Sequence, residues 1–236
     1  MTWSIIACDD EACGAAVASR FFAVGALCSR ACGGVGALST QALVNPLYAA
    51  PALEAMARGE PPSDIVARLA AADAGGDHRQ LHLIDAKGRI GAHTGAACIE
   101  WCGHRAGFKY SVAGNMLAGP QVLEATAHAF EMSAGRPLGE RLIAALIAGE
   151  AVGGDRRGKQ AAALVVCTTE TYPALDLRVD DHPEPLRELS RLYDKSLERF
   201  QPFVACLPTA TQPAGTCDRA AIEEAIERFQ LARAER

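Results

Sequence analysis

The sequence lacks the segments that direct a protein to a membrane or to nucleic acid. No apolar run approaches the roughly 20 residues that a membrane-spanning helix needs, and no basic segment followed by a hydrophobic stretch opens the chain as a secretory signal would. Lys and Arg number 23 against 28 Asp and Glu, for a formal net charge of −5, and they form no cluster of the kind that binds phosphate. We therefore expect a soluble cytoplasmic protein with no nucleic-acid and no membrane partner.

Motifs for a dinucleotide or a structural zinc ion are also missing. Gly33-Gly34-Val35-Gly36 leads into an apolar, strand-like run rather than a helix, so it is not a phosphate-binding turn. Cys28-x3-Cys32 and Cys98-x3-Cys102 are spaced more widely than the C-x2-C knuckles of zinc sites. The nine cysteines are odd in number and follow no secretory signal, which argues against a disulfide framework. We interpret them as small buried hydrophobic residues, with weak metal binding as the alternative, and expect no metal and no cofactor.

The first part of the chain predicts strands. Residues 3–8 and 14–20 are joined by the polar turn 9–11, a further strand region covers 21–25, and a strand entered through glycines covers 33–41. These runs are apolar at successive positions rather than at alternate ones. A sheet covered on both faces is the expected result.

Helices are predicted in pairs that alternate with groups of strands. Asn45 and Pro46 form a helix start, with Asn45 as the N-cap, and Ser63 caps the next helix. The predicted helices cover 47–58, 63–72, 120–133, 137–150, 184–200 and 218–233; the later strands cover 81–85, 89–94, 161–168 and 174–179. Residues 95–119 are expected to form a functional loop with short strands. This grouping predicts an α+β domain over residues 1–200, followed by a linker and C-terminal helix over 201–236.

Several segments resemble the N-terminal-nucleophile (Ntn) hydrolase superfamily and, within it, a domain-of-unknown-function family. They are Thr2-Trp3-Ser4-Ile5, Ala16-Val17-Ala18-Ser19-Arg20, Ser39-Thr40-Gln41, Asn45-Pro46, Trp101-Cys102-Gly103-His104, Gly114-Asn115, Gly153-Gly154-Asp155-Arg156-Arg157-Gly158-Lys159-Gln160 and Leu177-Arg178-Val179-Asp180-Asp181-His182-Pro183. The resemblance implies a four-layer αββα sandwich, to which this chain adds a C-terminal helical tail. The apolar layers and the habit of the superfamily favour a homo-oligomer, expected to be a dimer.

Thr2 is the candidate nucleophile that this resemblance implies. A small second residue favours removal of Met1, which would leave Thr2 with a hydroxyl and a free α-amine. That amine, with an ordinary pKa of about 7.7–8.0, can accept the hydroxyl proton. The alternative is that Thr2 only opens the first strand, because some members of the superfamily have lost activity.

Other polar residues are candidates for the same site. Asn115 is the candidate oxyanion donor, or else a turn residue. Ser19 and Arg20 end the second strand beside Thr2, where Arg20 would lower the pKa of the α-amine or form a surface ion pair. His104 is a candidate to bind substrate or transfer a proton, or else a structural, hydrogen-bonded His near Trp101.

Substrate-binding candidates follow at a strand-to-helix junction and on a glycine-flanked loop. Gln41 and Asn45 lie at the junction, where capping is the simpler role for Asn45. On the loop, Arg157 would clamp a substrate carboxylate, with Asp155 orienting it or binding a substrate amine and Gln160 nearby. The alternative is a solvated loop with an internal Asp–Arg pair.

Three functions remain open at this point. The first is an Ntn-type amidohydrolase that cleaves a C–N bond of a small amide, peptide or ureido-like substrate, with Thr2 and Asn115 as catalytic residues. The second is a catalytically silent Ntn-fold binding or scaffolding protein. A Cys/His metalloprotein is the third.

Overall fold

The computed structural model describes residues 2–10 and 12–234. It divides the chain into two compact units, one ending at Leu189 and the other beginning at Ser190. Both sheets lie in the first unit, and the predicted boundary at residue 200 stays a prediction. Met1, whose removal is predicted, and Glu11, part of the predicted first turn, lie outside the described residues.

Two antiparallel sheets form the centre of the first unit. The larger has the strand order β10–β9–β2–β1–β8–β7 and the smaller has the order β3–β4–β5–β6. The strands are β1 (Thr2–Cys8), β2 (Cys13–Ser19), β3 (Ser29–Cys32), β4 (Gly36–Ala42), β5 (Arg79–Asp85), β6 (Ile90–Thr94), β7 (Gly103–Gly107), β8 (Tyr110–Asn115), β9 (Ala161–Cys167) and β10 (Leu175–Val179). Strand β1 therefore lies inside the larger sheet, between β2 and β8.

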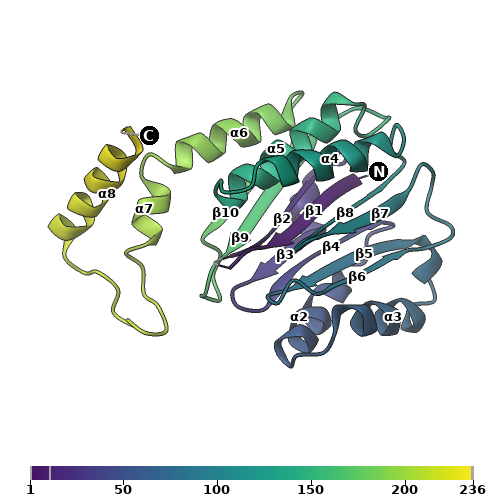
Figure 1. The fold of residues 1–236 in the computed structure, drawn as a ribbon, viewed down its shortest axis with the longest axis horizontal. Helices are drawn as coiled ribbons and strands as arrows, with labels where there is room; N and C mark the ends of the chain where they lie inside the picture. The colour runs from purple at the N-terminus through teal and green to yellow at the C-terminus, as the bar shows by residue number, and fades with distance from the viewer. Residues whose placement is uncertain (1, 11, 235–236) are drawn as a thin grey trace. The chain divides into compact units, whose positions relative to one another are not determined.

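Helices cover the outer face of each sheet. Helices α4 (Gln121–Met132) and α5 (Leu138–Ala151) pack on the larger sheet, and α2 (Ala49–Ala57) and α3 (Pro62–Ala72) pack on the smaller one. The sheets face each other through β1, β2 and β8 on one side and β3, β4 and β5 on the other. Figure 1 shows the resulting helix, sheet, sheet, helix layers. The predicted α+β class is confirmed.

The central strands are buried on both faces, as the apolar runs predict. Every residue of β1 and β2 is buried. Trp3 points toward the helix layer, where its ring lies against Gly154, whereas Ser4 and Ile6 point toward the smaller sheet. Alternation along β1 therefore separates a helix-facing side from a side that faces the interior between the sheets.

Several predicted boundaries are wrong, for local reasons. Residues 21–25 are not a strand: 21–23 form a turn and 24–25 begin the short helix α1 (Val24–Leu27). The run 33–41 contains a turn between β3 and β4. Helix α3 begins at Pro62, after the extended residue Pro61, so Ser63 is not its cap. Asn45 does cap the 3-10 turn η1 (Pro46–Tyr48), because its side chain accepts a hydrogen bond from Leu47 N at 3.2 Å.

Residues 95–119, expected to form a functional loop with short strands, do contain two short strands, β7 and β8, but β8 is an interior strand of the larger sheet. Strand β8 lies in this segment, is buried at every residue, and pairs with β1 from Thr2 opposite Asn115 to Ala7 opposite Tyr110. Its sequence contains Gly, Ala, Ser and Asn rather than a run of large apolar residues, so it gives a weak strand signal. The structure also joins Cys8 to Cys13 by a disulfide at the end of the β1–β2 hairpin, which corrects their interpretation as buried thiols.

The second unit contains α7 (Phe200–Val204) and α8 (Arg219–Ala234). Helix α7 occupies the beginning of the segment that was predicted to be a linker, and α8 confirms the C-terminal helix. An exposed ion pair joins Arg199 to Glu223, and Gln230 Nε2 donates to the carbonyls of Leu197 and Glu198 at 2.6 and 2.7 Å. None of the helices in the described part of the chain is both long enough and apolar enough to cross a membrane.

Candidate active site

Thr2 begins β1 inside the larger sheet and is almost fully buried, with 5% of its surface exposed. Its hydroxyl donates to Ser19 Oγ at 3.2 Å, across the β1–β2 ladder. Ser19 ends β2, and Asn115 ends β8 directly opposite Thr2. Three neighbouring strands thus bring Ser19 and Asn115 to the two sides of Thr2. In a chain without Met1, the nitrogen of Thr2 would be an amine at this same position.

The Thr2 carbonyl faces two side-chain amides. Gln41 Nε2 lies 3.4 Å from the Thr2 carbonyl oxygen, and Asn115 Nδ2 lies 3.5 Å from it. Both distances are long for a hydrogen bond. Gln41 comes from β4 of the smaller sheet, so the carbonyl is approached from both sheets. Asn115 is not a turn residue, because the left-handed backbone conformation belongs to Met116, with a φ of 52°.

Gln80, on β5, connects these two amides. Its Oε1 accepts from Gln41 Nε2 at 2.7 Å and from Asn115 Nδ2 at 3.2 Å. The side chain is completely buried. A buried amide without hydrogen-bond partners would cost several kcal/mol. Because Gln41, Gln80 and Asn115 are all buried, these two hydrogen bonds are needed to satisfy them.

A second polar path runs from Gln41 into the interior. Ser4 Oγ donates to Gln41 Oε1 at 2.7 Å and lies 2.9 Å from His82 Nε2, while His82 Nδ1 lies 3.0 Å from Ser111 Oγ. Burial, with a smaller contribution from His104, lowers the pKa of His82 to about 3. His82 is therefore a neutral imidazole at physiological pH.

Asp155 fixes the glycine-flanked loop against the end of β2. Its carboxylate accepts from the backbone N–H of Arg20 at 2.9 Å and of Arg157 at 2.8 Å, and it pairs with the Arg157 guanidinium at 3.1 Å. The Asp155 side chain is 1% exposed and that of Arg157 is 37% exposed. The internal Asp–Arg pair that the sequence offered as an alternative is thus present. Both oxygens of Asp155 also accept hydrogen bonds from backbone N–H groups.

Backbone geometry explains the glycines of this loop. Gly153, Gly154 and Gly158 have φ values of 123°, 47° and 103°, which side chains disfavour. A Cβ on Gly154 would also lie 3.2 Å from the Trp3 ring. Arg20 NH1 donates to the Arg157 carbonyl. The loop therefore begins beside Trp3 of β1 and returns to Arg20. Arg20 directly follows Ser19, which accepts the hydrogen bond from the Thr2 hydroxyl.

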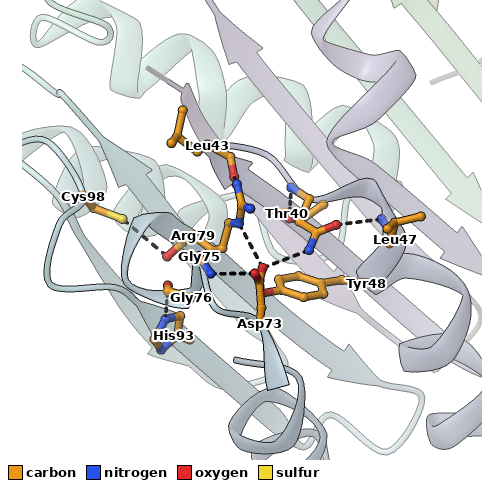
Figure 2. A network of polar contacts seen from close by, with 11 residues as sticks. Thr40, Leu43, Leu47, Tyr48, Asp73, Gly75, Gly76, Arg79, His93 and Cys98 are labelled. Carbon is orange, nitrogen blue, oxygen red and sulfur yellow. Dashed lines mark hydrogen bonds and ion pairs between the residues drawn. The ribbon is translucent and has the colours of Figure 1, made fainter. Parts of the chain in front are cut away.

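Asn45 belongs to a different cluster. Figure 2 shows this cluster, which is centred on Asp73. The Asp73 carboxylate accepts from Asn45 Nδ2 at 2.9 Å, Tyr48 OH at 2.7 Å and Arg79 Nε at 3.0 Å. These donors lower the pKa of Asp73, the Tyr48 hydroxyl first among them, and burial raises the pKa of Tyr48 to about 12. Asn45 thus caps η1 and joins it to the end of α3, since its side chain bonds to Leu47 and Asp73 rather than to the residues around Thr2.

The last two candidates lie at the margins of the site. His104 Nδ1 lies 3.0 Å from Thr94 Oγ1, which accepts from Gln80 Nε2 at 2.9 Å, so His104 is joined to the interior through two side chains. Burial, followed by the charge of His93, lowers the pKa of His104. Gln160 donates through its backbone to the Ser19 carbonyl at 3.1 Å, while its side chain donates to Asp181.

Sequence reasoning missed four residues of this network: Ser4, Gln80, His82 and Ser111. A signal for two of them was present, because Gln80 and His82 are polar residues at alternate positions of a strand whose interior also contains Leu81, Leu83 and Ile84. One face of that strand therefore needed polar partners. Ser4 and Ser111 gave no comparable signal, since serine is common in buried strands of small residues.

The remaining thiols show no arrangement for a metal. Among the described residues, no group of three or more His, Cys, Asp or Glu side chains is placed to hold a metal ion. Burial raises the pKa of the Cys28 thiol to about 12 and of the Cys167 thiol to about 11. Both are protonated at neutral pH and pack as small apolar groups.

Fold and site together define an α+β protein with two antiparallel sheets and a buried threonine at the start of its central strand. The sequence matches a family described as a family of unknown function (DUF1028) over residues 2–189. The chain belongs to the DUF1028 family.

A solved structure from the same family agrees with this assignment. The crystal structure of protein SPO2555 from Silicibacter pomeroyi, a DUF1028 protein, is 30% identical and has a TM-score of 0.85; the match covers 92% of this chain and 96% of that one. Anbu (ancestral beta-subunit) from Yersinia bercovieri is 12% identical, with a TM-score of 0.42, over 83% of this chain and 94% of that one. The search of curated proteins found no match.

Proposed function

We propose that this protein is an N-terminal-nucleophile amidohydrolase that cleaves a C–N bond of a small amide, peptide or ureido-like compound. The observation that carries the proposal is the environment of Thr2. It is buried at the start of β1, its hydroxyl contacts Ser19, and two side-chain amides approach its carbonyl. The sequence of helix, sheet, sheet and helix layers is also the one that the Ntn resemblance implies.

In this proposal Thr2 acts after Met1 is removed. The hydroxyl oxygen attacks the substrate carbonyl while its proton passes to the α-amine. The tetrahedral intermediate collapses when the α-ammonium protonates the leaving nitrogen, and an ester on Thr2 remains. Water, deprotonated by the same amine, hydrolyses the ester and releases the acid. No cofactor takes part in these steps.

Asn115 is the proposed oxyanion donor. Its contact with the Thr2 carbonyl is 3.5 Å long, so turning this N–H toward a negatively charged oxygen would exchange a weak contact for a stronger, charge-assisted one. Its other contact, with Gln80, holds the amide plane in place. A rigid donor aimed at the developing charge typically contributes about 2.7–4 kcal/mol to catalysis.

Arg157 is the proposed substrate ligand. Asp155 already accepts from two backbone N–H groups and the Arg157 guanidinium, so its role is to fix the loop rather than to bind an amine. The side chain of Arg157 is 37% exposed, so a substrate carboxylate could approach its guanidinium from solvent. Arg20, anchored beside it, adds positive charge near the α-amine, which would favour the neutral form of that amine.

The alternative is a catalytically silent binding or scaffolding protein. It is favoured by the fact that both N–H groups of Asn115 have acceptors inside the protein. The expected homodimer, the small amide partner and the cytoplasmic location stay predictions.

Turnover of an amide panel tests the proposal. Wild type, Thr2→Ser and Thr2→Ala would be incubated with short peptides, N-acyl amino acids and ureido acids, and amine release measured. All three second residues are small enough to permit Met1 removal, so the variants differ only at the nucleophile. We expect activity in wild type, reduced or similar activity in Thr2→Ser, and none in Thr2→Ala. Equal turnover by wild type and Thr2→Ala would refute the proposal.

A further inference from the structure

Gln80 has more polar contacts than any role in packing requires. It is completely buried on β5, and its Nε2 lies 3.0 Å from the Gly103 carbonyl, 2.9 Å from the Gly114 carbonyl and 2.9 Å from Thr94 Oγ1. The two glycines belong to β7 and β8 of the larger sheet, where they are opposite each other. Gln80 therefore reaches from one sheet to the backbone of the other.

The two backbone carbonyls determine which way the Gln80 amide faces. Backbone carbonyls only accept hydrogen bonds, so the side of Gln80 that faces Gly103 and Gly114 must be its NH2 group. A flipped amide would place oxygen against two carbonyl oxygens in a buried site. Oε1 consequently faces Gln41 and Asn115, as the 2.7 and 3.2 Å distances show.

The orientation of Gln80 fixes the two amides next to it. Because Oε1 only accepts, Gln41 and Asn115 must each present their NH2 group to it. The same NH2 groups lie 3.4 and 3.5 Å from the Thr2 carbonyl oxygen. One buried glutamine thus determines that N–H groups, rather than oxygens, face Thr2.

The order of donors continues as far as His82. With its NH2 turned to Gln80, Gln41 offers Oε1 to the Ser4 hydroxyl at 2.7 Å. The Ser4 proton is then used, so Ser4 Oγ must accept from His82 Nε2–H, and His82 Nδ1 must accept from Ser111. The network requires the neutral Nε2–H tautomer of His82.

We propose that Gln80 is a positioning residue of the Thr2 site, which turns the side-chain N–H groups of Gln41 and Asn115 toward the Thr2 carbonyl. The orientation of these amides does not depend on whether the protein is an enzyme, but an effect of Gln80 on reaction rate rests on the proposed function. Holding this carbonyl limits rotation of Thr2 and keeps its hydroxyl and nitrogen in one geometry. Asn115 is oriented by the same contact toward the place of the developing charge.

An NMR experiment tests the positioning without any substrate. The chain contains two Trp, and only Trp3 follows a Thr. Protein labelled with ¹³C-carbonyl Thr and ¹⁵N Trp therefore gives a single HNCO signal, which reports the Thr2 carbonyl. We expect an upfield shift of this carbonyl in Gln80→Met, because two donors lose their orientation, and no shift in the matched control Thr94→Val. An unchanged signal in Gln80→Met would overturn the proposal.

A second measurement uses only the wild-type protein, so it tests the assigned hydrogen-bond order even if Gln80→Met does not fold. The ¹⁵N shifts of the His82 ring distinguish its two tautomers. We expect a protonated Nε2 and an unprotonated Nδ1. An Nδ1–H tautomer would reverse the Ser4 and Gln41 donors and so overturn the assigned order.

The catalytic consequence is measured separately, with a β-lactone that acylates the Thr2 hydroxyl by opening its strained ring. We expect Gln80→Met to be acylated on the order of 10²-fold more slowly at saturation, the effect of a displacement of about 1 Å, with Thr94→Val close to wild type. Equal rates in Gln80→Met and wild type would overturn the role of Gln80. Absence of acylation in wild type would instead count against Thr2 as nucleophile, and the HNCO shift would still decide the positioning.

Discussion

The interior between the two sheets has a polar end and an apolar end, although the same strands line both. The polar end contains Thr2 and Ser4 of β1, Gln41 of β4, and Gln80 and His82 of β5. Every one of these side chains has a hydrogen-bond partner among the described residues. This end lies where β1 begins.

Further along the same strands the interior becomes apolar. Ile6 and Cys8 of β1 pack against Ala37 of β4 and Ile84 of β5, together with Cys13 of β2. Burial of apolar side chains stabilises this end by roughly 25 cal/mol per Å². At the polar end each buried group gains at most a modest net contribution from its hydrogen bond. The contrast indicates that the apolar end contributes most to folding, and in our proposal the polar end serves the Thr2 site.

A polar substitution at the apolar end should have the largest effect. Ile84 is completely buried there, so Ile84→Gln would bury an amide without partners and lose apolar contacts. We expect a loss of roughly 3–5 kcal/mol in the free energy of unfolding, measured by denaturation in urea. Ile84→Leu should cost less than about 1.5 kcal/mol. Similar stability of Ile84→Gln and wild type would mean that this end also holds polar partners.

Asp155→Asn should have the next largest effect, because it disturbs the loop that borders the polar end. The side chain is 1% exposed and its two oxygens accept from Arg20 and Arg157. Replacing one oxygen by NH2 sets donor against donor, and we expect a loss of roughly 2–3 kcal/mol. Asp180→Asn is the matched control, since the Arg178–Asp180 pair is about 40% exposed on both sides and should contribute less than about 1 kcal/mol. Equal losses in the two variants would contradict this account.

Acidification should weaken the polar end through His82. Burial lowers the pKa of His82 to about 3 from an ordinary value of 6.5, so between these values the unfolded chain binds a proton that the folded protein does not. Stability from this group is fully present above pH 6.5 and falls as the pH decreases toward 3. The loss at pH 5 should be about 2 kcal/mol relative to pH 8.

The control for this prediction is His82→Gln, which cannot titrate. Urea denaturation at several pH values should show a smaller decrease in stability for this variant over the same range. Parallel pH profiles for His82→Gln and wild type would show that His82 does not titrate as its burial requires.

Loss of the Cys8–Cys13 disulfide should have the smallest effect. The bridge spans a separation of 5 residues, and closing so short a loop restricts the unfolded chain by at most about 2 kcal/mol. Denaturation with and without a thiol reductant would measure the difference, with Cys8→Ala/Cys13→Ala as the variant that reductant cannot affect. If the reduced protein failed to fold, the disulfide would contribute more to stability than the loop-closure value, and this prediction would be wrong.

The sequence predicted the apolar end better than the polar one. Continuous apolar runs in β1, β2 and β9 indicated a sheet covered on both faces, and proline- or Asn-initiated helices were identified in pairs. Short strands were expected within residues 95–119, but the bounds of β8 and its place beside β1 were not, because Gly114 and Ala113 are weak strand formers. Close packing accounts for Gly114, where a Cβ would lie 2.5 Å from Leu117. Local pattern does not report such close packing.

The candidate site was predicted in part. Thr2, Ser19, Gln41 and Asn115 are brought together, whereas Asn45 joins the Asp73 cluster. Gln80, which connects Gln41 to Asn115, comes from β5. This strand pairs with β4 in the smaller sheet and contacts β1 across the interior between the two sheets. Gln80 depends on this tertiary contact, which a single sequence does not show. The roles of these residues in catalysis stay predictions.

Intact-mass spectrometry of wild-type protein treated with the β-lactone tests the central claim most directly. The account predicts a chain that lacks Met1 and gains one probe mass, located on Thr2 by fragmentation, with no adduct on Thr2→Ala. A chain that retains Met1 and still hydrolyses amides, or an equal adduct on Thr2→Ala, would contradict it.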